Sequence, residues 1–138
     1  MGTLLFADDL SLALPPPVTV RPEGRIAAVL SVGRDMLLLQ YREMVLRLAP
    51  CSVTSALPEQ ALGLLADREY DVVLLGHTLS AEERAAFGRM VRHDHPHARL
   101  VGLASQEPQE CELGLFDELL CSDYGPGRLL TTLLRCLA

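Results

Sequence analysis

The sequence predicts an α/β domain whose parallel β-sheet is covered by helices on both faces. From residue 25 onward, short apolar runs alternate with longer segments in which apolar residues recur every three or four positions. Strands that alternate with helices in a short chain imply right-handed crossovers between parallel strands. Hydrophobic residues make up 49% of the 138 residues, which is enough to build the core of one domain.

The beginning of this region predicts a strand, a helix and a second strand. Residues 26–32 form a nearly continuous apolar run, as in a buried parallel strand. Residues 35–48 have the periodicity of an amphipathic helix, which Pro50 ends. Its recurring apolar residues are Leu37, Leu38, Tyr41, Val45 and Leu48. Residues 51–56 alternate weakly and are rich in β-formers, so they predict the second strand.

The middle of the chain continues this alternation. Pro58 suits the first turn of a second helix that runs to about Asp67, because proline needs no backbone donor there. Residues 71–75 give the strongest strand signal in the chain. Ser80 and Glu83 have the spacing of a capping box, in which each side chain accepts a hydrogen bond from the other residue's backbone N–H. They therefore predict the start of a third helix.

The remaining elements complete five strand–helix units. The third helix is expected to end near Pro96. Residues 100–103 and 118–121 predict the fourth and fifth strands, and the segment 125–127 opens the last helix. Five such units predict the flavodoxin-like strand order 2-1-3-4-5.

Residues 1–24 differ from the domain expected at 25–138 and form a separate leader. The triple proline at 15–17 favours extended polyproline geometry. The leader also contains an apolar cluster: Leu4, Leu5, Phe6, Leu10, Leu12 and Leu14. Two interpretations stay open, a loosely ordered terminus or an arm that docks on its own domain or on another subunit. Homodimerisation through the leader is compatible with either function hypothesis below.

Charge and cysteine content exclude several classes of function. The net charge is -6, and every basic residue is an arginine, with no basic cluster. This argues against binding to nucleic acid or to an anionic membrane surface. No apolar run approaches the length of a membrane span. The cysteines form no C-x-x-C pair, so we expect reduced thiols in a cytoplasmic protein; a redox pair of Cys111 and Cys121 is the less favoured alternative.

Three segments resemble the receiver domain of two-component response regulators (CheY-like). They are residues 25–32 as the first strand, 70–79 around the third strand, and 125–130 at the start of the last helix. The resemblance covers nearly everything after Gly24 and implies a flavodoxin-like three-layer sandwich with a role in bacterial signalling. The stretch 105–117 is shorter than the family's fourth-helix region and contains Pro108, so we expect that helix to be short or missing.

The resemblance also implies where a phosphorylation site would lie. In the family, a carboxylate after the third strand accepts the phosphoryl group and two acidic residues after the first strand hold Mg²⁺. A Thr or Ser after the fourth strand and a Lys after the fifth contact the phosphoryl oxygens. Here the phosphoacceptor position is Gly76, the acidic pair falls on Gly33 and Arg34, the hydroxyl on Ala104 and the Lys on Ser122. We therefore expect no aspartyl phosphorylation, no metal and no cofactor.

A few polar residues near the predicted strand and helix ends allow two interpretations. Asp35 is either a remaining metal ligand or, as we favour, the cap of the first helix. His77 either orders its loop, which we favour, or binds a ligand. His93, His95 and His97 either form a solvated helix end, which we favour, or ligate a metal.

No common hydrolase, nucleotide-hydrolase or dinucleotide-binding motif is present, so we expect no enzymatic activity. The leading hypothesis is a pseudo-receiver that presents a fixed surface to a protein partner in bacterial two-component signalling. The candidate surfaces are the leader and the last helix with the altered loop before it. The alternative is a small-ligand or nucleotide sensor that uses the crevice between Gly33 and Gly76, with Arg34 as the anion contact.

Overall fold

The computed structural model describes residues 26–105, 109–121 and 125–138, which contain one five-stranded parallel sheet. The strands are β1 (Ala28–Val32), β2 (Ser52–Ala56), β3 (Val72–Leu75), β4 (Arg99–Leu103) and β5 (Glu118–Leu120). Their order is β2-β1-β3-β4-β5, and every neighbouring pair is parallel. The predicted fold class and strand order are thus confirmed.

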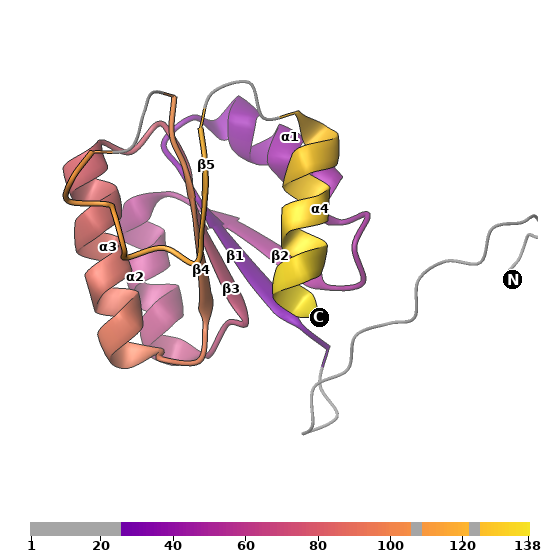
Figure 1. Cartoon of the computed structure of the whole chain (residues 1–138). Coiled ribbons are helices and arrows are strands. Elements are labelled where there is room, and N and C mark those ends of the chain that lie inside the picture. Colours follow the sequence, from indigo (N-terminus) through magenta and orange to yellow (C-terminus); the bar gives the residue numbers. More distant parts are fainter. Residues whose placement is uncertain (1–25, 106–108, 122–124) are drawn as a thin grey trace, which may run out of the picture.

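The helices form two outer layers around this sheet. They are α1 (Met36–Leu46), α2 (Pro58–Asp67), α3 (Ala81–Asp94) and α4 (Pro126–Leu137). Helices α1 and α4 cover one face, and α2 and α3 cover the other (Figure 1). None of the helices in the described ranges is both long and apolar enough to span a membrane.

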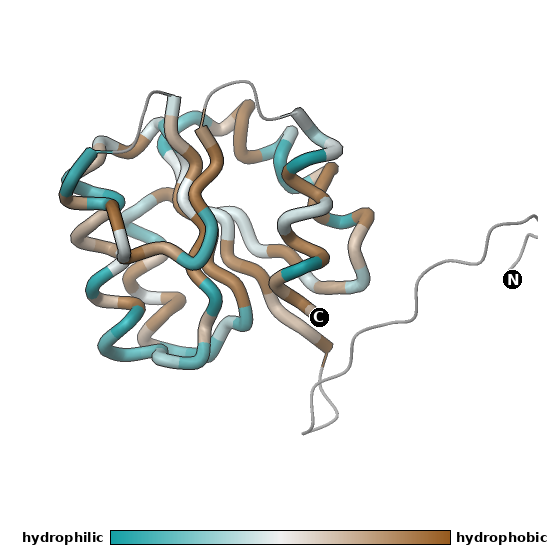
Figure 2. The backbone as a smooth tube through the Cα atoms, viewed as in Figure 1, coloured by the Kyte–Doolittle hydropathy of each residue, from teal (hydrophilic) through white to brown (hydrophobic). Residues whose placement is uncertain are grey.

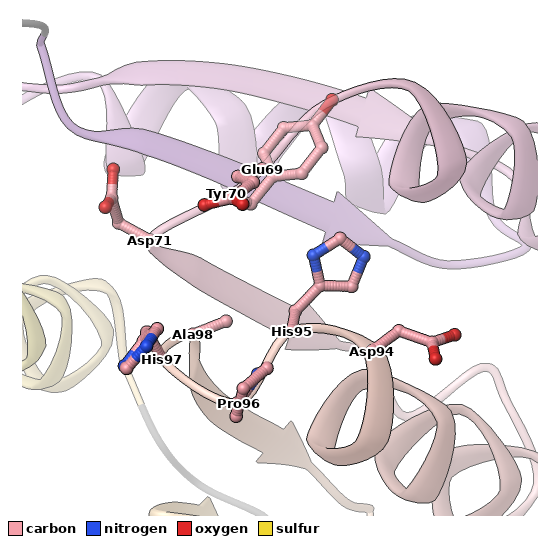
Figure 3. Close-up of a pocket in the computed structure, with 8 residues that line it drawn as sticks. All are labelled: Glu69, Tyr70, Asp71, Asp94, His95, Pro96, His97 and Ala98. Carbon is pink, nitrogen blue, oxygen red and sulfur yellow. The ribbon is translucent and has the colours of Figure 1, made fainter.

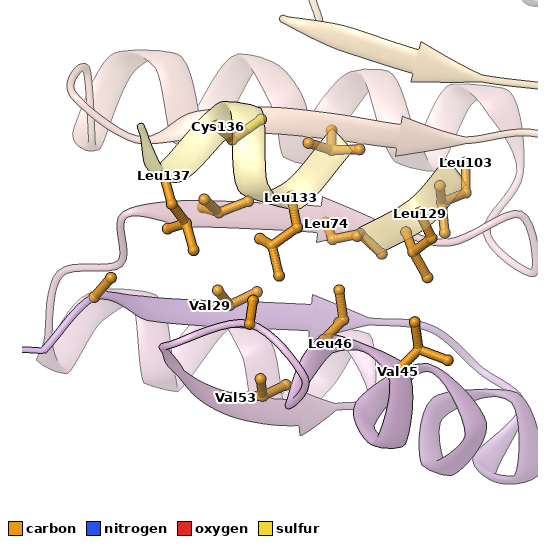
Figure 4. Close-up of a cluster of buried hydrophobic side chains, with 14 of the residues drawn as sticks. Val29, Val45, Leu46, Val53, Leu74, Leu103, Leu129, Leu133, Cys136 and Leu137 are labelled. Carbon is orange, nitrogen blue, oxygen red and sulfur yellow. The ribbon is translucent and has the colours of Figure 1, made fainter. Parts of the chain in front are cut away.

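Two buried clusters fill the space between the layers. Successive strand residues alternate between them, so that Val72 and Leu74 face one layer of helices while Val73 and Leu75 face the other. The first cluster joins β1 to Val45 and Leu46 of α1 and to the leucines of α4 (Figure 4). Figure 2 shows the hydrophobic residues concentrated in the central strands. Both faces of the sheet are therefore buried, which explains the continuous apolar runs of the sequence.

The predicted helix starts are found where the sequence placed them. The backbone N–H of Glu83 donates to Ser80 Oγ at 3.0 Å, and that of Ser80 donates to Glu83 Oε1 at 2.9 Å. Helices α2 and α4 begin at Pro58 and Pro126. These local signals are strong because each satisfies, or makes unnecessary, a backbone donor that a helix start leaves unpaired.

The apolar periodicity of residues 35–48 predicted the helix α1 but not its buried face. Of the five residues that defined that periodicity, only Val45 is buried, and Leu37, Tyr41 and Leu48 are exposed. The buried face consists of Leu39, Arg42, Val45 and Leu46. Because apolar residues occur on both sides of α1 and an arginine lies on the inner side, the sequence pattern does not distinguish the two faces.

The region between β4 and β5 confirms the expected loss of the fourth helix. The described residues 109–117 contain turns and no helix, and the preceding residues 106–108 lie outside the described part of the chain. The segment is fixed to α3 by the buried Arg84, whose Nε donates to Glu112 Oε1 at 2.6 Å. Arg92 adds two hydrogen bonds to the carbonyl oxygen of Leu115.

Candidate functional site

The carboxyl ends of the central strands meet at one edge of the sheet, where parallel α/β folds bind ligands. Gly33 follows β1, Gly76 follows β3 and Ala104 follows β4. The N–H of Gly76 donates to the carbonyl oxygen of Val32 at 2.9 Å, so the two glycine-containing loops leave the sheet side by side. Four of the five predicted positions, Arg34 among them, are therefore brought to this edge. Ser122, the fifth, lies outside the described residues.

The guanidinium of Arg42 occupies the space between these two loops. A Cβ atom added to Gly76 would lie 2.5 Å from Arg42 Nη1, and one added to Gly33 would lie 3.6 Å from the same atom. Helical side chains tilt toward the N-terminus of their helix, so Arg42 reaches back along α1 to the edge of the sheet. The residue is 1% exposed. A buried cation thus fills the place where a side chain of residue 76 would begin.

His77 accepts a hydrogen bond from this arginine. Arg42 Nη2 lies 2.9 Å from His77 Nδ1. Because a guanidinium N–H can only donate, Nδ1 must be the acceptor, and the neutral ring carries its proton on Nε2. Burial, with the positive charges of Arg42 and Arg84, lowers the pKa of His77 below its usual value of 6.5. His77 therefore orders its loop as a neutral partner of Arg42, which supports the favoured interpretation.

Arg34 connects the β1–α1 loop to both helices of the opposite layer. Its guanidinium pairs with Glu83 at the start of α3 and lies 3.7 Å from Glu59 of α2. Its backbone N–H donates to Thr78 Oγ1 at 2.8 Å. The hydrogen bond to Glu83 raises the pKa of Arg34 and lowers that of Glu83. An anion that used Arg34 would have to compete with the carboxylate of Glu83.

Asp35 is the N-cap of α1, as the sequence favoured. Its Oδ1 accepts hydrogen bonds from the N–H groups of Leu37 at 3.0 Å and Leu38 at 3.3 Å. These are two of the backbone donors that a helix start leaves unpaired. The carboxylate is thus used locally, within its own helix.

The donors at this edge do not fit the Mg²⁺ ion that the receiver fold implies. Magnesium requires oxygen ligands, and carboxylates supply them best. Here Asp35 caps α1, Glu83 pairs with Arg34, and the group nearest to Gly76 is the cation of Arg42. Within residues 26–105, 109–121 and 125–138, no cluster of three or more His, Cys, Asp or Glu side chains could hold a metal.

A polar hollow of about 240 Å³ lies next to His77, between the loops that follow β3 and β4. Ser80 and Glu82 line it from the start of α3, and Ser105 lines it from the end of β4. Arg84 also borders the hollow, but its Nη1 donates to the carbonyl oxygen of Leu79 and its Nε to Glu112. The hollow offers neutral donors and one carboxylate rather than a free cation.

The histidines in the last turn of α3 and just after it lie at the opposite end of the sheet. His95 and His97 line a small pocket of about 60 Å³ with Asp71 and Asp94, and their rings point in different directions (Figure 3). His93 Nδ1 lies 2.8 Å from the carboxylate of Asp94 at the exposed helix end. These positions match the favoured interpretation of a solvated helix end.

The cysteines of the described residues are free thiols. Cys111 is exposed, and its Sγ lies 3.8 Å from the carbonyl oxygen of Ala81. Cys121 is half-buried. No disulfide joins them in the described part of the chain.

Sequence reasoning missed Arg42, Arg84 and Glu112, three buried charged residues that organise this end of the domain. Arg42 stands three residues after Leu39 and three before Val45, so placement on the true buried face would have shown a charge directed into the fold. Glu112 had no comparable signal, because its turn has neither periodicity nor a motif.

Comparisons with known proteins agree with this architecture. No protein-family model matches the sequence, and no curated protein matches it significantly. The chemotaxis response regulator CheY4 of Vibrio cholerae superposes with a TM-score of 0.70 at 21% identity, covering 80% of this chain and 98% of that chain. The signal receiver domain of an HD domain-containing protein from Pseudomonas fluorescens Pf-5 gives 0.72 at 21% identity, covering 82% and 95%.

An orphan response regulator of H. pylori gives a TM-score of 0.70 at 16% identity, covering 81% of this chain and 97% of that chain. At these identities, the similarity concerns the fold and not the chemistry at the carboxyl edge of the sheet. The chain therefore has the fold of a CheY-like receiver domain.

Proposed function

We propose that this chain is a receiver-fold protein that is not phosphorylated and that presents a fixed surface to a protein partner in bacterial two-component signalling. The observation that supports it most is the position of Arg42, whose guanidinium lies where the side chain of residue 76 would begin. In the family that the sequence resembles, this side chain is the carboxylate that receives the phosphoryl group. The chain has a buried cation in its place.

The charge at this edge supports the same proposal. A phosphorylated receiver needs Mg²⁺ held by carboxylates next to the acceptor, and a divalent cation is repelled by a fixed positive charge at short range. Arg42 is such a charge, and Arg34 keeps Glu83 in an ion pair. Even an aspartate introduced at position 76 would first meet the guanidinium of Arg42, with which it would form an ion pair.

The same arrangement favours the absence of catalytic activity. His77 is the one imidazole that borders this edge in the described residues, and its Nδ1 already accepts from Arg42. Arg42 is the side chain that the described hydrogen bonds give His77, and a guanidinium is not a nucleophile. A nucleophile and its base are the minimum that a hydrolase or transferase site requires.

The segment 109–117 is the surface that we assign to the partner. It stands where the receiver fold has its fourth helix, and hydrogen bonds from Arg84 to Glu112 and from Arg92 to Leu115 attach it to α3. Leu113 stands at its outer side and is 60% exposed. It is the large apolar side chain that this segment exposes most, so it is the position at which a substitution tests contact with a partner. The acidic surface of the chain argues against nucleic acid and membranes in this role.

Affinity capture with the full chain tests this function. The tagged protein is the bait in a lysate of its source organism, in parallel with a Leu113→Asp variant and a Leu62→Asp control on α2. We expect a histidine kinase, a response regulator or another signalling protein to be enriched by the wild-type chain and by the control, and to be lost with Leu113→Asp. The proposal is wrong if no signalling protein is enriched, or if the Leu113→Asp variant enriches it as strongly as the wild-type chain does.

A ligand sensor is the second candidate, and the hollow beside His77 is the observation in its favour. A neutral ligand suits it better than a phosphate, because Arg34 and Arg84 already bind carboxylates. A thermal shift with a panel of nucleotides and neutral metabolites separates the two candidates. A rise in Tm that disappears in His77→Ala supports the sensor. A nucleotide-dependent rise that disappears in Arg34→Ala supports the anion contact expected from the sequence.

A further inference from the structure

The outer side of α1 carries a stripe of large apolar side chains. Its members are Leu37 (77% exposed), Tyr41 (49%), Met44 (71%) and Leu48 (70%). Their spacing of four, three and four residues places them on one face of the helix and the turn that follows it. We call this surface the α1 stripe. A shallow hollow of about 360 Å³ lies beside Met44 on the same side.

An exposed stripe of this kind is unusual for a free surface. Large apolar side chains that form a contiguous patch generally mark a site that is covered in the working molecule. The stripe is not left over from the core, because Leu39, Val45 and Leu46 already supply the inner face of α1. We propose that the chain's own N-terminal segment, residues 4–14, covers the α1 stripe within the same molecule.

The composition of that segment supports this occupant. Residues 4–14 lie outside the described part of the chain, and their apolar members are Leu4, Leu5, Phe6, Ala7, Leu10, Leu12, Ala13 and Leu14. A segment this apolar gains free energy by burial, at about 25 cal/mol per Å² of apolar surface. The α1 stripe is the complementary surface: four large exposed apolar side chains, bordered by Gln40, Glu43 and Arg47.

The connection between the two surfaces is long enough. The chain enters the domain next to the end of α1, since Ala27 belongs to the same buried cluster as Leu46 and Ala49. Helix α1 is about 16 Å long at 1.5 Å per residue. Residues 15–25 can span about 34 Å in the extended geometry that prolines favour, at 3.1 Å per residue. Residues 4–14 can therefore lie along the whole stripe.

Docking within one molecule is favoured over docking on a second copy. A short linker holds the two surfaces at an effective concentration on the order of 1 mM. An intrinsic dissociation constant of about 0.1 mM then gives about 90% occupancy. A second copy at a concentration of about 1 μM would need an affinity roughly a thousandfold tighter for the same occupancy. The inference does not depend on the proposed function, because both surfaces belong to this chain.

Photo-crosslinking of the full chain tests the inference. Phe6 is replaced by p-benzoylphenylalanine, which keeps the aromatic ring and inserts into nearby C–H bonds on irradiation. Trypsin cuts only after arginine here, because the chain contains no lysine. The leader is then recovered as the peptide 1–25, and the stripe falls mainly in the peptides 35–42 and 43–47. We expect these peptides to be joined within the monomer, with a yield independent of protein concentration.

Exposed substitutions supply the controls. The pair Leu37→Asp and Met44→Asp should reduce the cross-link yield about tenfold, because two charges replace apolar contacts that stabilise the docked state. Leu62→Asp on α2 should leave the yield unchanged, since this equally apolar residue lies on the other side of the sheet and is 52% exposed. The inference is wrong if the leader cross-links to other peptides or only to a second chain. It is also wrong if the Leu37→Asp and Met44→Asp substitutions leave the cross-link yield unchanged.

Discussion

Replacing Gly76 by alanine tests whether Arg42 is fixed in the place of a side chain. The new Cβ would lie 2.5 Å from Arg42 Nη1 and 3.1 Å from the carbonyl oxygen of Val32. The first distance is too short for a stable contact, so the guanidinium must move. Backbone conformation does not contribute, because Gly114 is the one glycine with a positive φ in the described residues. The substitution therefore measures the overlap with Arg42, together with a smaller one at the carbonyl oxygen of Val32.

The expected loss of stability follows from three terms. Overpacking a filled site by one methyl group costs about 1–3 kcal/mol. Moving Arg42 also weakens its charged hydrogen bond to His77, and such bonds contribute about 1.5–3 kcal/mol. Alanine restores about 0.4–1 kcal/mol by restricting the unfolded chain. We expect Gly76→Ala to lower the free energy of unfolding by about 2–5 kcal/mol, which corresponds to a Tm lower by roughly 8–20 °C.

Urea denaturation followed by circular dichroism measures this free energy. Gly63→Ala is the matched control, because a Cβ at this position of α2 meets no atom within 4 Å and alanine favours the helix. A second background, Arg42→Met, keeps the aliphatic stem and removes the guanidinium. There Gly76→Ala should cost at least 1 kcal/mol less. If Gly76→Ala is as stable as Gly63→Ala, or costs the same in both backgrounds, Arg42 does not occupy this place.

Four further predictions concern the residues that support the site. Arg84→Met leaves the buried carboxylate of Glu112 without its cation, so it should cost about 3–5 kcal/mol and abolish hydrogen-exchange protection in 109–115. Burial would raise the pKa of Glu112, but the hydrogen bonds from Arg84 and the Gln109 N–H outweigh it and hold this pKa below the usual 4.5. The contribution of the Glu112 carboxylate to the free energy of unfolding should therefore be complete above pH 4.5. It should disappear as the pH falls through the pKa of Glu112 in the folded state. NMR titration of His77 should show a neutral ring, protonated on Nε2, down to a pH below 6.5, with stability falling below that pH as the unfolded state takes up the proton. Asp35→Ala should lower the free energy of unfolding in urea by about 1 kcal/mol, whereas Asp35→Ser should retain most of it.

The fold was predictable because its strands are buried on both faces. Short, valine-rich apolar runs such as residues 71–75 are typical of buried parallel strands, and the rule of right-handed crossovers reduces the possible strand orders to very few. Helix starts such as Ser80 and Pro58 were also predictable, because their signals act within one turn of the chain. Each of these features depends on a few neighbouring residues.

The orientation of α1 depends on distant contacts and was not predictable in the same way. Residues 36–48 have apolar side chains on both sides, so the sequence alone cannot say which side packs against β1 and α4. The sheet selects the side that contains Leu39 and Leu46, and this places Arg42 inside and Met44 outside. The orientation of α1 about its own axis thus explains both the buried cation of Arg42 and the exposed α1 stripe.

The sequence predicts which phosphorylation residues the candidate site lacks, but it does not predict which side chains fill the site instead. The sequence alone shows glycine at position 76 and no lysine in the chain. The side chain that fills the space comes from another element, 34 residues before Gly76, and only the three-dimensional packing brings it there. The engagement of Arg34 by Glu83 is a long-range contact of the same kind.

Intact mass spectrometry after treatment with a small phosphodonor shows whether this chain accepts a phosphoryl group. The full chain is incubated with acetyl phosphate and Mg²⁺, beside a receiver domain known to be phosphorylated as a positive control. A Gly76→Asp variant and its combination with Arg42→Met are treated in the same way. We predict no added phosphoryl group on the wild-type chain or on Gly76→Asp alone. A phosphoryl adduct on the wild-type chain would contradict the account, because a site filled by Arg42 would then still accept the group.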